Sequence, residues 1–218
     1  MAETLEKQEE KQRPQRRKDA RPQEIVAAAL HEFSQHGFAA TRLDDVAARA
    51  GVAKGTIYLY FNSKADLFKA VVRETMVPQF EQFGLEISEF DGPTEDLLKL
   101  LLKRMAHDFV ETDVRHIIRL VQAEGRQFPE LAEFYFNEAI SRGMASVRQI
   151  LARGVARGEF RETGLEAFPQ LIVSPALMAT MWKSTFESFS PLDFDQAMEV
   201  HLDVILNGLK TSGPTDTE

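Results

Sequence analysis

Residues 43–62 read LDDVAARAGVAKGTIYLYFN, and this stretch has the spacing of a helix-turn-helix. Such a unit needs a small residue where its two helices cross and a glycine in the turn, where φ is positive. It also needs a branched apolar residue that faces back from the second helix. Ala47, Gly51 and Ile57 occupy these three positions. The stretch therefore predicts two short helices joined by a tight turn.

Helical signals also flank this stretch on both sides. Pro22 suits the first turn of a helix, apolar residues then recur at helical spacing, and Gly37 is expected to end that helix by adopting a positive φ. Two capping signatures, each a hydroxyl followed three residues later by an acid, are expected to open the next helices: Thr41 with Asp44, and Ser63 with Asp66.

The remainder of the chain predicts further helices. No stretch alternates with the period of a strand over a useful length, and the Gly and Pro breaks fall between helix-length segments. The expected fold class is all-α, with an N-terminal three-helix unit followed by a larger helical bundle. Residues 1–20 are mostly Glu, Lys, Gln and Arg and predict a disordered basic arm, and residues 211–218 predict a polar tail.

Composition excludes several classes of protein. The chain has 218 residues and is 44% apolar and 28% charged, as in an ordinary globular protein. It contains no cysteine, which excludes disulfides and thiolate metal sites. No apolar run reaches the ~18 to 20 residues of a membrane helix, and the N-terminus has no signal-peptide core. We expect a cytoplasmic protein without membrane contact.

The charge is distributed unevenly along the chain. The overall net charge is −8, yet residues 11–72 contain eleven Lys and Arg against six acids, a net of +5. Residues 73–218 contain fourteen basic and twenty-four acidic residues, a net of −10. A basic N-terminal part on an acidic remainder is typical of a protein that approaches phosphates with one end only.

The second helix of the motif carries side chains suited to DNA. The face opposite Ile57 displays polar and small residues, whose amine and hydroxyl groups can bind phosphates or base edges, while glycine allows close approach of the backbone. These residues are Lys54, Gly55, Thr56 and Leu59, with Tyr58 and Tyr60 at the flanks.

At these positions the sequence resembles the TetR family of bacterial transcriptional regulators. The resemblance extends from Ile25 to Phe68 and is carried by GF at 37–38, VA at 46–47, AGV at 50–52, KGTIY at 54–58, YF at 60–61 and LF at 67–68. It implies a DNA-binding domain over residues 21–68 and a helical effector-binding and dimerisation domain over residues 69–210. The resemblance further implies that Thr41, Tyr58, Tyr60 and Lys64 contact the DNA backbone, and that Lys54, Gly55, Thr56 and Leu59 face bases.

The resulting functional prediction is a ligand-responsive repressor. It would bind a palindromic operator in double-stranded DNA as a homodimer and be released by a small apolar effector. The last two apolar segments, up to residue 209, supply the predicted dimer interface, namely Leu177, Met198, Leu202, Ile205 and Leu209. Methionine and aromatic residues supply the predicted effector site, namely Met105, Phe109, Tyr135, Met178 and Trp182.

Two alternatives remain open from the sequence. A DNA-binding regulator without a small-molecule ligand would use its C-terminal part only to dimerise. A helical metal-dependent enzyme would use a cluster of ionisable residues at a helix junction: His107, Asp108, Glu111, Asp113 and His116. Because acidic side chains at helix ends are usually just solvated, we expect no catalytic activity, no metal and no cofactor.

Overall fold

The computed structural model describes the backbone of residues 2–210 and the side chains of residues 21–210. The predicted polar tail, residues 211–218, lies outside the described residues. Within this described range the chain forms helices and no strand, which confirms the all-α prediction. The helices are α1 (Ala2–Ala40), α2 (Leu43–Arg49), α3 (Lys54–Ile57), α4 (Lys64–Glu89), α5 (Thr94–Glu111), α6 (Val114–Glu124), α7 (Pro129–Tyr135), the π-helical turn η1 (Phe136–Ile140), α8 (Ser141–Ala156), the 3-10 turn η2 (Leu165–Ala167), α9 (Gln170–Thr185) and α10 (Phe194–Leu209).

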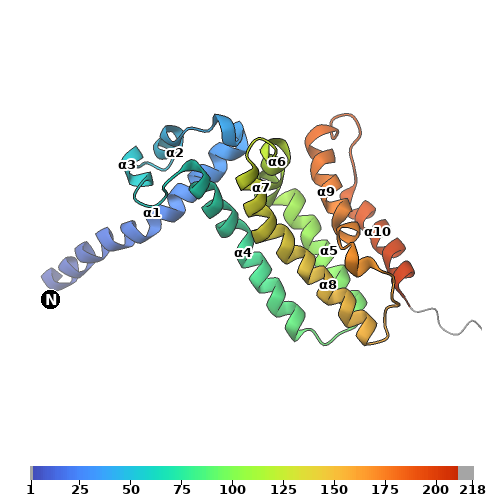
Figure 1. Ribbon diagram of the computed structural model, residues 1–218. Coiled ribbons are helices and arrows are strands. Elements are labelled where there is room, and N and C mark those ends of the chain that lie inside the picture. The colour runs from blue at the N-terminus through green and yellow to red at the C-terminus, as the bar shows by residue number, and fades with distance from the viewer. Residues whose placement is uncertain (1, 211–218) are drawn as a thin grey trace, which may run out of the picture.

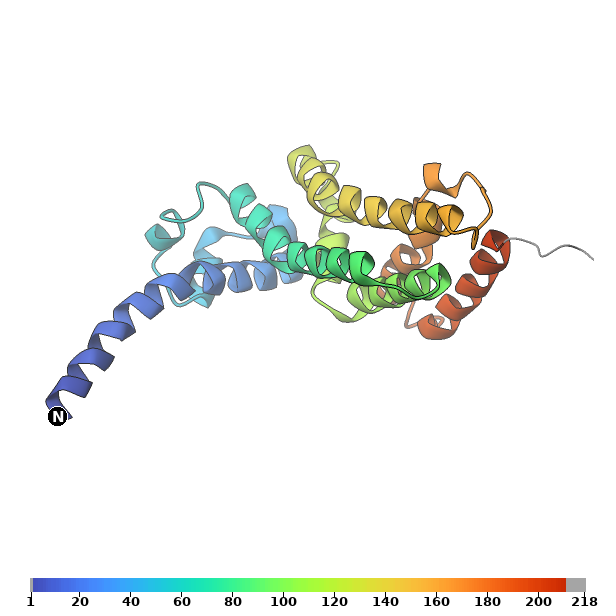
Figure 2. The same cartoon turned by 90° about the horizontal axis from the view of Figure 1, so that it is seen from below.

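The helices form two groups that α4 connects (Figure 1). At one end, α1, α2, α3 and the first turns of α4 make a small unit, which we call the N-terminal unit. The rest of α4 runs along α5 and α8 in a bundle, which α9 and α10 complete on the side away from the N-terminal unit (Figures 1 and 2). We call α4 to α10 the C-terminal bundle.

Helix α1 is longer than the sequence suggested. Where a disordered arm was expected over residues 1–20, the backbone is helical from Ala2, and Pro22 lies inside the helix instead of in its first turn. Residues 2–20 are mostly Glu, Lys, Gln, Arg and Ala, which are strong helix formers. This first half of α1 projects away from the rest of the chain (Figure 2).

The helix-turn-helix geometry is as predicted. Val46, Ala47 and Ile57 are buried in the N-terminal unit. Gly51 in the turn has φ +66°, and the amide of Val52 donates to the carbonyl of Ala47 across it, at 3.0 Å. The small residue, the glycine and the branched residue therefore occupy the places for which the motif requires them.

Only one of the two predicted helix caps forms. The Ser63 hydroxyl accepts a hydrogen bond from the Asp66 amide at 3.0 Å and caps α4 as expected. The predicted Thr41 cap is wrong, because α2 begins after Arg42 without a side-chain cap. Thr41 is only 3% exposed, and its hydroxyl donates instead to the carbonyls of Gly37 and Glu32 in α1, at 2.6 and 3.2 Å.

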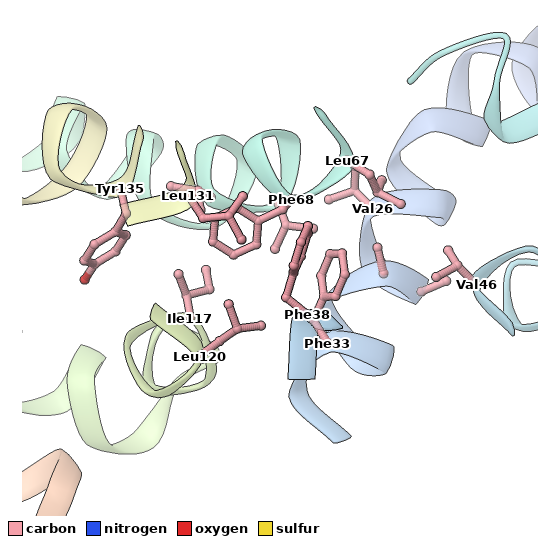
Figure 3. Close-up of a cluster of buried hydrophobic side chains, with 14 of the residues drawn as sticks. Val26, Phe33, Phe38, Val46, Leu67, Phe68, Ile117, Leu120, Leu131 and Tyr135 are labelled. Atoms are coloured by element: carbon pink, nitrogen blue, oxygen red, sulfur yellow. The ribbon is translucent and has the colours of Figure 1, made fainter. Parts of the chain in front are cut away.

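The hydrophobic core of the N-terminal unit continues into the C-terminal bundle. Figure 3 shows Phe38 and Phe68 beside Ile117 of α6 and Leu131 of α7. The Phe38 ring also packs edge-on against Phe128, with centroids 4.9 Å apart. The two parts of the chain therefore share one packed core, and a movement of α6 or α7 is felt directly by α1 and α4.

A second core fills the far end of the bundle, between the last turns of α4 and helices α5, α8, α9 and α10. Its fully buried residues include Leu97, Leu102, Ile150 and Ile172. The two cores meet around Phe109 and Ile140, which pack against both.

Gly37 interrupts α1 near its end with φ +76° and ψ 172°, a conformation that is essentially restricted to glycine. A Cβ at this position would also overlap the Glu124 carboxylate of α6. We expect Gly37→Ala to lower the free energy of unfolding by about 1–3 kcal/mol, as measured by urea denaturation.

Gly51→Ala provides the matched control for this substitution. Gly51 also has a positive φ, but no described atom lies within 4 Å of the position of its Cβ. The control should therefore show only the cost of backbone strain, about 1–2 kcal/mol. Equal losses of stability in the two variants would show that the contact with Glu124 has no role.

Candidate functional site

Helix α3 presents one face to solvent at the end of the N-terminal unit. Lys54 and Gly55 are exposed, Thr56 is partly exposed, and Leu59, just after the helix, is 78% exposed. No described atom lies within 4 Å of where a Gly55 Cβ would be. With Ile57 buried behind it, this is the face that the sequence predicted, and its shape and polarity suit the major groove of DNA.

The positive charge of Lys54 on this face is partly neutralised by Asp44 of α2. The Lys54 ammonium lies 2.9 Å from the Asp44 carboxylate, which raises the pKa of Lys54 above its ordinary value. Both side chains are about half exposed, so this pair contributes little to stability. The pairing orients Lys54 along the surface between α2 and α3.

The two tyrosines flank the α3 face as predicted. Tyr58 is half exposed, and Tyr60 is somewhat more covered, with its ring beside Phe61. Their position next to an exposed cation suits hydroxyl contacts with a phosphate backbone.

Lys64 does not extend into solvent as a phosphate contact requires. Its ammonium donates to the carbonyls of Phe38, Ala39 and Thr41, at 2.6, 3.0 and 2.9 Å, and lies 4.6 Å from the centre of the Phe38 ring. Burial lowers the pKa of Lys64. The side chain therefore holds the backbone at the end of α1 in place, and its predicted contact with DNA stays a prediction.

The other side of the same backbone is held by Glu124, the last residue of α6. Its two carboxylate oxygens accept hydrogen bonds from the amides of Phe38 and Ala39, at 2.8 and 2.7 Å. We call residues 37–41 the clamped loop, because Glu124 binds its amides and Lys64 binds its carbonyls. Sequence reasoning missed this contact, since the partners are about 85 residues apart and no local pattern connects them.

An apolar pocket lies inside the C-terminal bundle between α4, α5, α8 and the π-helical turn η1. Its cavity volume is about 70 Å³, below the roughly 300–1,000 Å³ usual for small-molecule sites, so a ligand of that size fits only if the walls move apart. Its walls are mostly apolar, and residues that form them include Met76, Phe80, Phe83, Leu101, Met144 and Val173. The π-helical turn was not predicted, and it forms one wall of the pocket through Ala139 and Ile140.

Few polar groups reach this pocket. The Arg104 guanidinium binds both carboxylate oxygens of Glu86 at 3.0 Å, and burial raises the pKa of the neighbouring Asp108. The Tyr135 hydroxyl points away from the core cluster in Figure 3 and has no hydrogen-bond partner among the described residues. Burial also raises the pKa of Tyr135, so its hydroxyl remains a neutral donor.

The predicted effector residues divide into two groups. Met105, Phe109 and Tyr135 do line the pocket. Met178 and Trp182 do not, because α9 turns these residues away from it. Met178 is exposed on the outer side of the bundle, and the Trp182 indole donates to the carbonyl of Ser190 at 2.7 Å and packs on Phe186.

Comparison with known protein families agrees with this architecture. Residues 25–71 match the model of bacterial regulatory proteins of the tetR family, and residues 91–198 match that of the tetracyclin repressor-like C-terminal domain. The chain belongs to the TetR family. It is therefore a DNA-binding transcriptional regulator, and α2 and α3 form its helix-turn-helix.

Individual members of the TetR family are similar over most of the chain. The transcriptional repressor KstR2 of Mycolicibacterium smegmatis is 25% identical over 88% of this chain and 92% of its own. The fatty acid metabolism regulator protein of Bacillus subtilis is 29% identical over 66% of this chain and 74% of its own. The crystal structure of FadR from Bacillus subtilis in complex with stearoyl-CoA superposes with a TM-score of 0.69 at 22% identity, covering 85% of this chain and 98% of that one.

The residues predicted for the dimer interface of this TetR-family chain pack mostly inside their own chain. Met198, Leu202 and Leu209 are buried in the core of their own chain, and Leu177 and Ile205 are partly buried against it. The helix is apolar on two sides, and helical periodicity alone does not show which side faces inward. The exposed apolar residues lie on the outer face of α9 and α10: Leu171, Met178 and Met181, with Val200 and Val204.

The ionisable cluster at the end of α5 does not assemble into a metal site. Among the described residues, no three or more His, Asp or Glu side chains gather closely enough to hold a metal ion. Glu111 is paired with Lys183 at 2.6 Å, and Asp108 faces the apolar pocket. None of the helices in residues 2–210 is long and apolar enough to cross a membrane.

The contrast between Lys64 and Lys54 gives a prediction for stability. Lys64→Ala removes the donor for three carbonyls of the clamped loop and should lower the free energy of unfolding by about 1–3 kcal/mol. Lys54→Ala breaks only an exposed pair and should change it by less than about 1 kcal/mol. Urea denaturation of both variants measures the difference, and a Lys64→Ala variant as stable as the wild type would contradict the clamp.

Proposed function

We propose that this TetR-family regulator is a dimeric repressor whose operator binding is released by an apolar effector with a long chain. The observation that carries the proposal is the apolar pocket between α4, α5, α8 and η1, with Tyr135 in its wall. The Tyr135 hydroxyl is a neutral donor that can bind one acceptor of a ligand in this pocket. The similarity to a FadR that binds stearoyl-CoA supports an effector with a long acyl chain.

Operator recognition is assigned to the exposed α3 face. Lys54, Gly55, Thr56 and Leu59 would approach base edges in the major groove, and Tyr58 and Tyr60 would contact phosphates. Thr41 and Lys64 would act indirectly, because their side chains are bound to the backbone of the N-terminal unit itself. They would fix the position of α2 and α4 relative to α3.

The pocket is connected to the N-terminal unit by continuous helices. Met76, Phe80 and Phe83 of its wall belong to α4, and the first turns of α4 hold Lys64 and the core residue Phe68. An effector that separates α4 from α5 and α8 would therefore shift the N-terminal unit. The shift releases operator DNA only if the effector binds the displaced arrangement more tightly than the DNA-bound one.

Dimerisation is assigned to the outer face of α9 and α10. Two helices from each chain would form a four-helix arrangement around a two-fold axis. The two α3 helices of such a dimer would reach half-sites one DNA turn apart, about 34 Å, which requires an approximately palindromic operator.

A pocket-filling variant tests the effector site. Gly143 lines the pocket, and a Cβ there would lie 3.7 Å from the Phe80 ring, an ordinary contact, so Gly143→Leu places its side chain into the empty volume. Operator DNA would first be selected from a random-sequence pool with the wild type. Long-chain fatty acids and their CoA thioesters should then weaken wild-type binding about 5- to 150-fold and leave the variant bound.

Gly84→Leu is the control for the pocket-filling variant. Gly84 lies on the exposed side of α4, with no described atom within 4 Å of its Cβ position. This variant should bind DNA and respond to the effector like the wild type, as measured by fluorescence anisotropy of labelled operator. A full response in Gly143→Leu would contradict the assignment of the pocket.

Val204→Glu tests the dimer face. Val204 is 63% exposed in the chain, so the substitution leaves the fold intact but places an unpaired charge in the proposed interface. Sedimentation velocity should show monomers at concentrations where the wild type is dimeric. Leu85→Glu on α4 is the control, because Leu85 is also 63% exposed, and it should remain dimeric. Two variants with the same sedimentation coefficient would exclude this face.

A further inference from the structure

A second cleft lies next to the apolar pocket, between α6, the end of α5 and the last turns of α9. Its cavity volume is about 190 Å³. The side chains of Arg115, His116 and Arg119 line it from α6, and Lys183 lines it from α9. We call it the basic cleft, because three of its lining residues are permanently cationic and none is acidic.

This concentration of positive charge is unusual for its surroundings. Residues 73–218 carry a net charge of −10, with twenty-four acids against fourteen bases. The three cations repel one another, and Glu111 beside the cleft offsets part of this repulsion through its ion pair with Lys183 and its attraction to Arg115. Burial, and to a lesser degree the positive charge of Arg115, lowers the pKa of His116.

The cations in the cleft are only partly satisfied within the chain. Arg119 is exposed and makes no hydrogen bond or ion pair with any described residue. Arg115 is held in place by the Val110 carbonyl at 3.1 Å but has no carboxylate partner among the described residues. Lys183 is half exposed and pairs with Glu111, just outside the cleft, at 2.6 Å.

The basic cleft and the apolar pocket share a wall. Phe109 lines both, and its carbonyl accepts a hydrogen bond from Thr180, another residue of the cleft, at 3.2 Å. Phe109 is partly buried and packs against both hydrophobic cores where the two spaces adjoin. A molecule that displaces this ring reaches from apolar walls to cationic side chains.

We propose that the basic cleft binds the phosphate groups of an effector whose apolar chain occupies the adjoining pocket, as in a long-chain acyl-CoA. This inference rests on the proposed function and adds the chemistry of the polar end of the effector. Guanidinium groups bind phosphates and carboxylates alike through paired, charge-assisted hydrogen bonds. Two arginines in one cleft match the several negative charges of the CoA phosphates better than the single charge of a free fatty acid.

The cleft also lies on the helix that holds the N-terminal unit. Arg115 and Arg119 occupy the first half of α6, and Glu124, at its other end, binds the clamped loop. Figure 1 shows α6 between the N-terminal unit and α9. A phosphate bound between α6 and α9 would pull directly on the helix that positions residues 37–41.

Calorimetric titration of the full-length protein tests the proposal without DNA. The ligands are palmitoyl-CoA, palmitate and CoA, and the variants are Arg119→Ala and the control Arg126→Ala, an exposed arginine on the turn after α6. Palmitoyl-CoA should bind the wild type at least about tenfold more tightly than palmitate or CoA. Arg119→Ala should weaken palmitoyl-CoA about tenfold and leave palmitate unchanged, and Arg126→Ala should change neither.

Other outcomes overturn the proposal in distinguishable ways. If palmitate and palmitoyl-CoA bind equally and Arg119→Ala has no effect, the phosphate site is wrong, while the effector pocket stands. If CoA binds as tightly as palmitoyl-CoA and Gly143→Leu does not weaken either, the cleft binds phosphate without the pocket, and the proposed function fails instead. If none of the three ligands binds the wild type, the acyl-CoA assignment is excluded.

Discussion

Hydrogen bonds that hold the clamped loop from two sides connect the N-terminal unit of this TetR-family chain to its C-terminal bundle. Glu124 accepts hydrogen bonds from two amides of the loop, and Lys64 donates to three of its carbonyls. The positive φ of Gly37 makes room for the carboxylate, because any Cβ there would overlap it. Buried backbone groups must be paired, and here the partners come from α6 and α4, so the end of α1 is positioned by the bundle. The orientation of the helix-turn-helix therefore depends on where α4 and α6 lie.

Packing strengthens this dependence. The aromatic cluster of Phe33, Phe38 and Phe68 extends to Phe128, Ile117 and Leu131 without a break, so the N-terminal unit is not an independent domain on a linker. Close-packed interiors transmit displacements instead of absorbing them. The apolar pocket uses the same α4 that carries Phe68, and the basic cleft uses the same α6 that carries Glu124. A ligand that occupies both would act on the two helices that hold the clamped loop.

The surfaces of the chain differ in charge, and each suits a different kind of binding partner. The α3 face carries Lys54 on a basic N-terminal part, whereas the bundle is strongly acidic apart from the basic cleft. Acidic bundle surface disfavours wrapping by DNA, and the cleft, enclosed between helices, is shaped for a small anion and not for a duplex. The outer face of α9 and α10 carries exposed apolar residues, as a surface that meets a second protein does.

The sequence by itself determined the helical class, the helix-turn-helix and its exposed face, because these follow from the local spacing of Ala47, Gly51 and Ile57 and from helical periodicity. It also grouped Met105, Phe109 and Tyr135, which line one pocket in the structure. Only the tertiary structure decided that Lys64 and Thr41 bind backbone instead of solvent, that Glu124 reaches the end of α1, and that the inner face of α10 belongs to the core of its own chain. Periodicity shows that a helix face is apolar, but which element covers that face depends on contacts between segments far apart in the chain. The partner of each buried charge likewise comes from a distant segment.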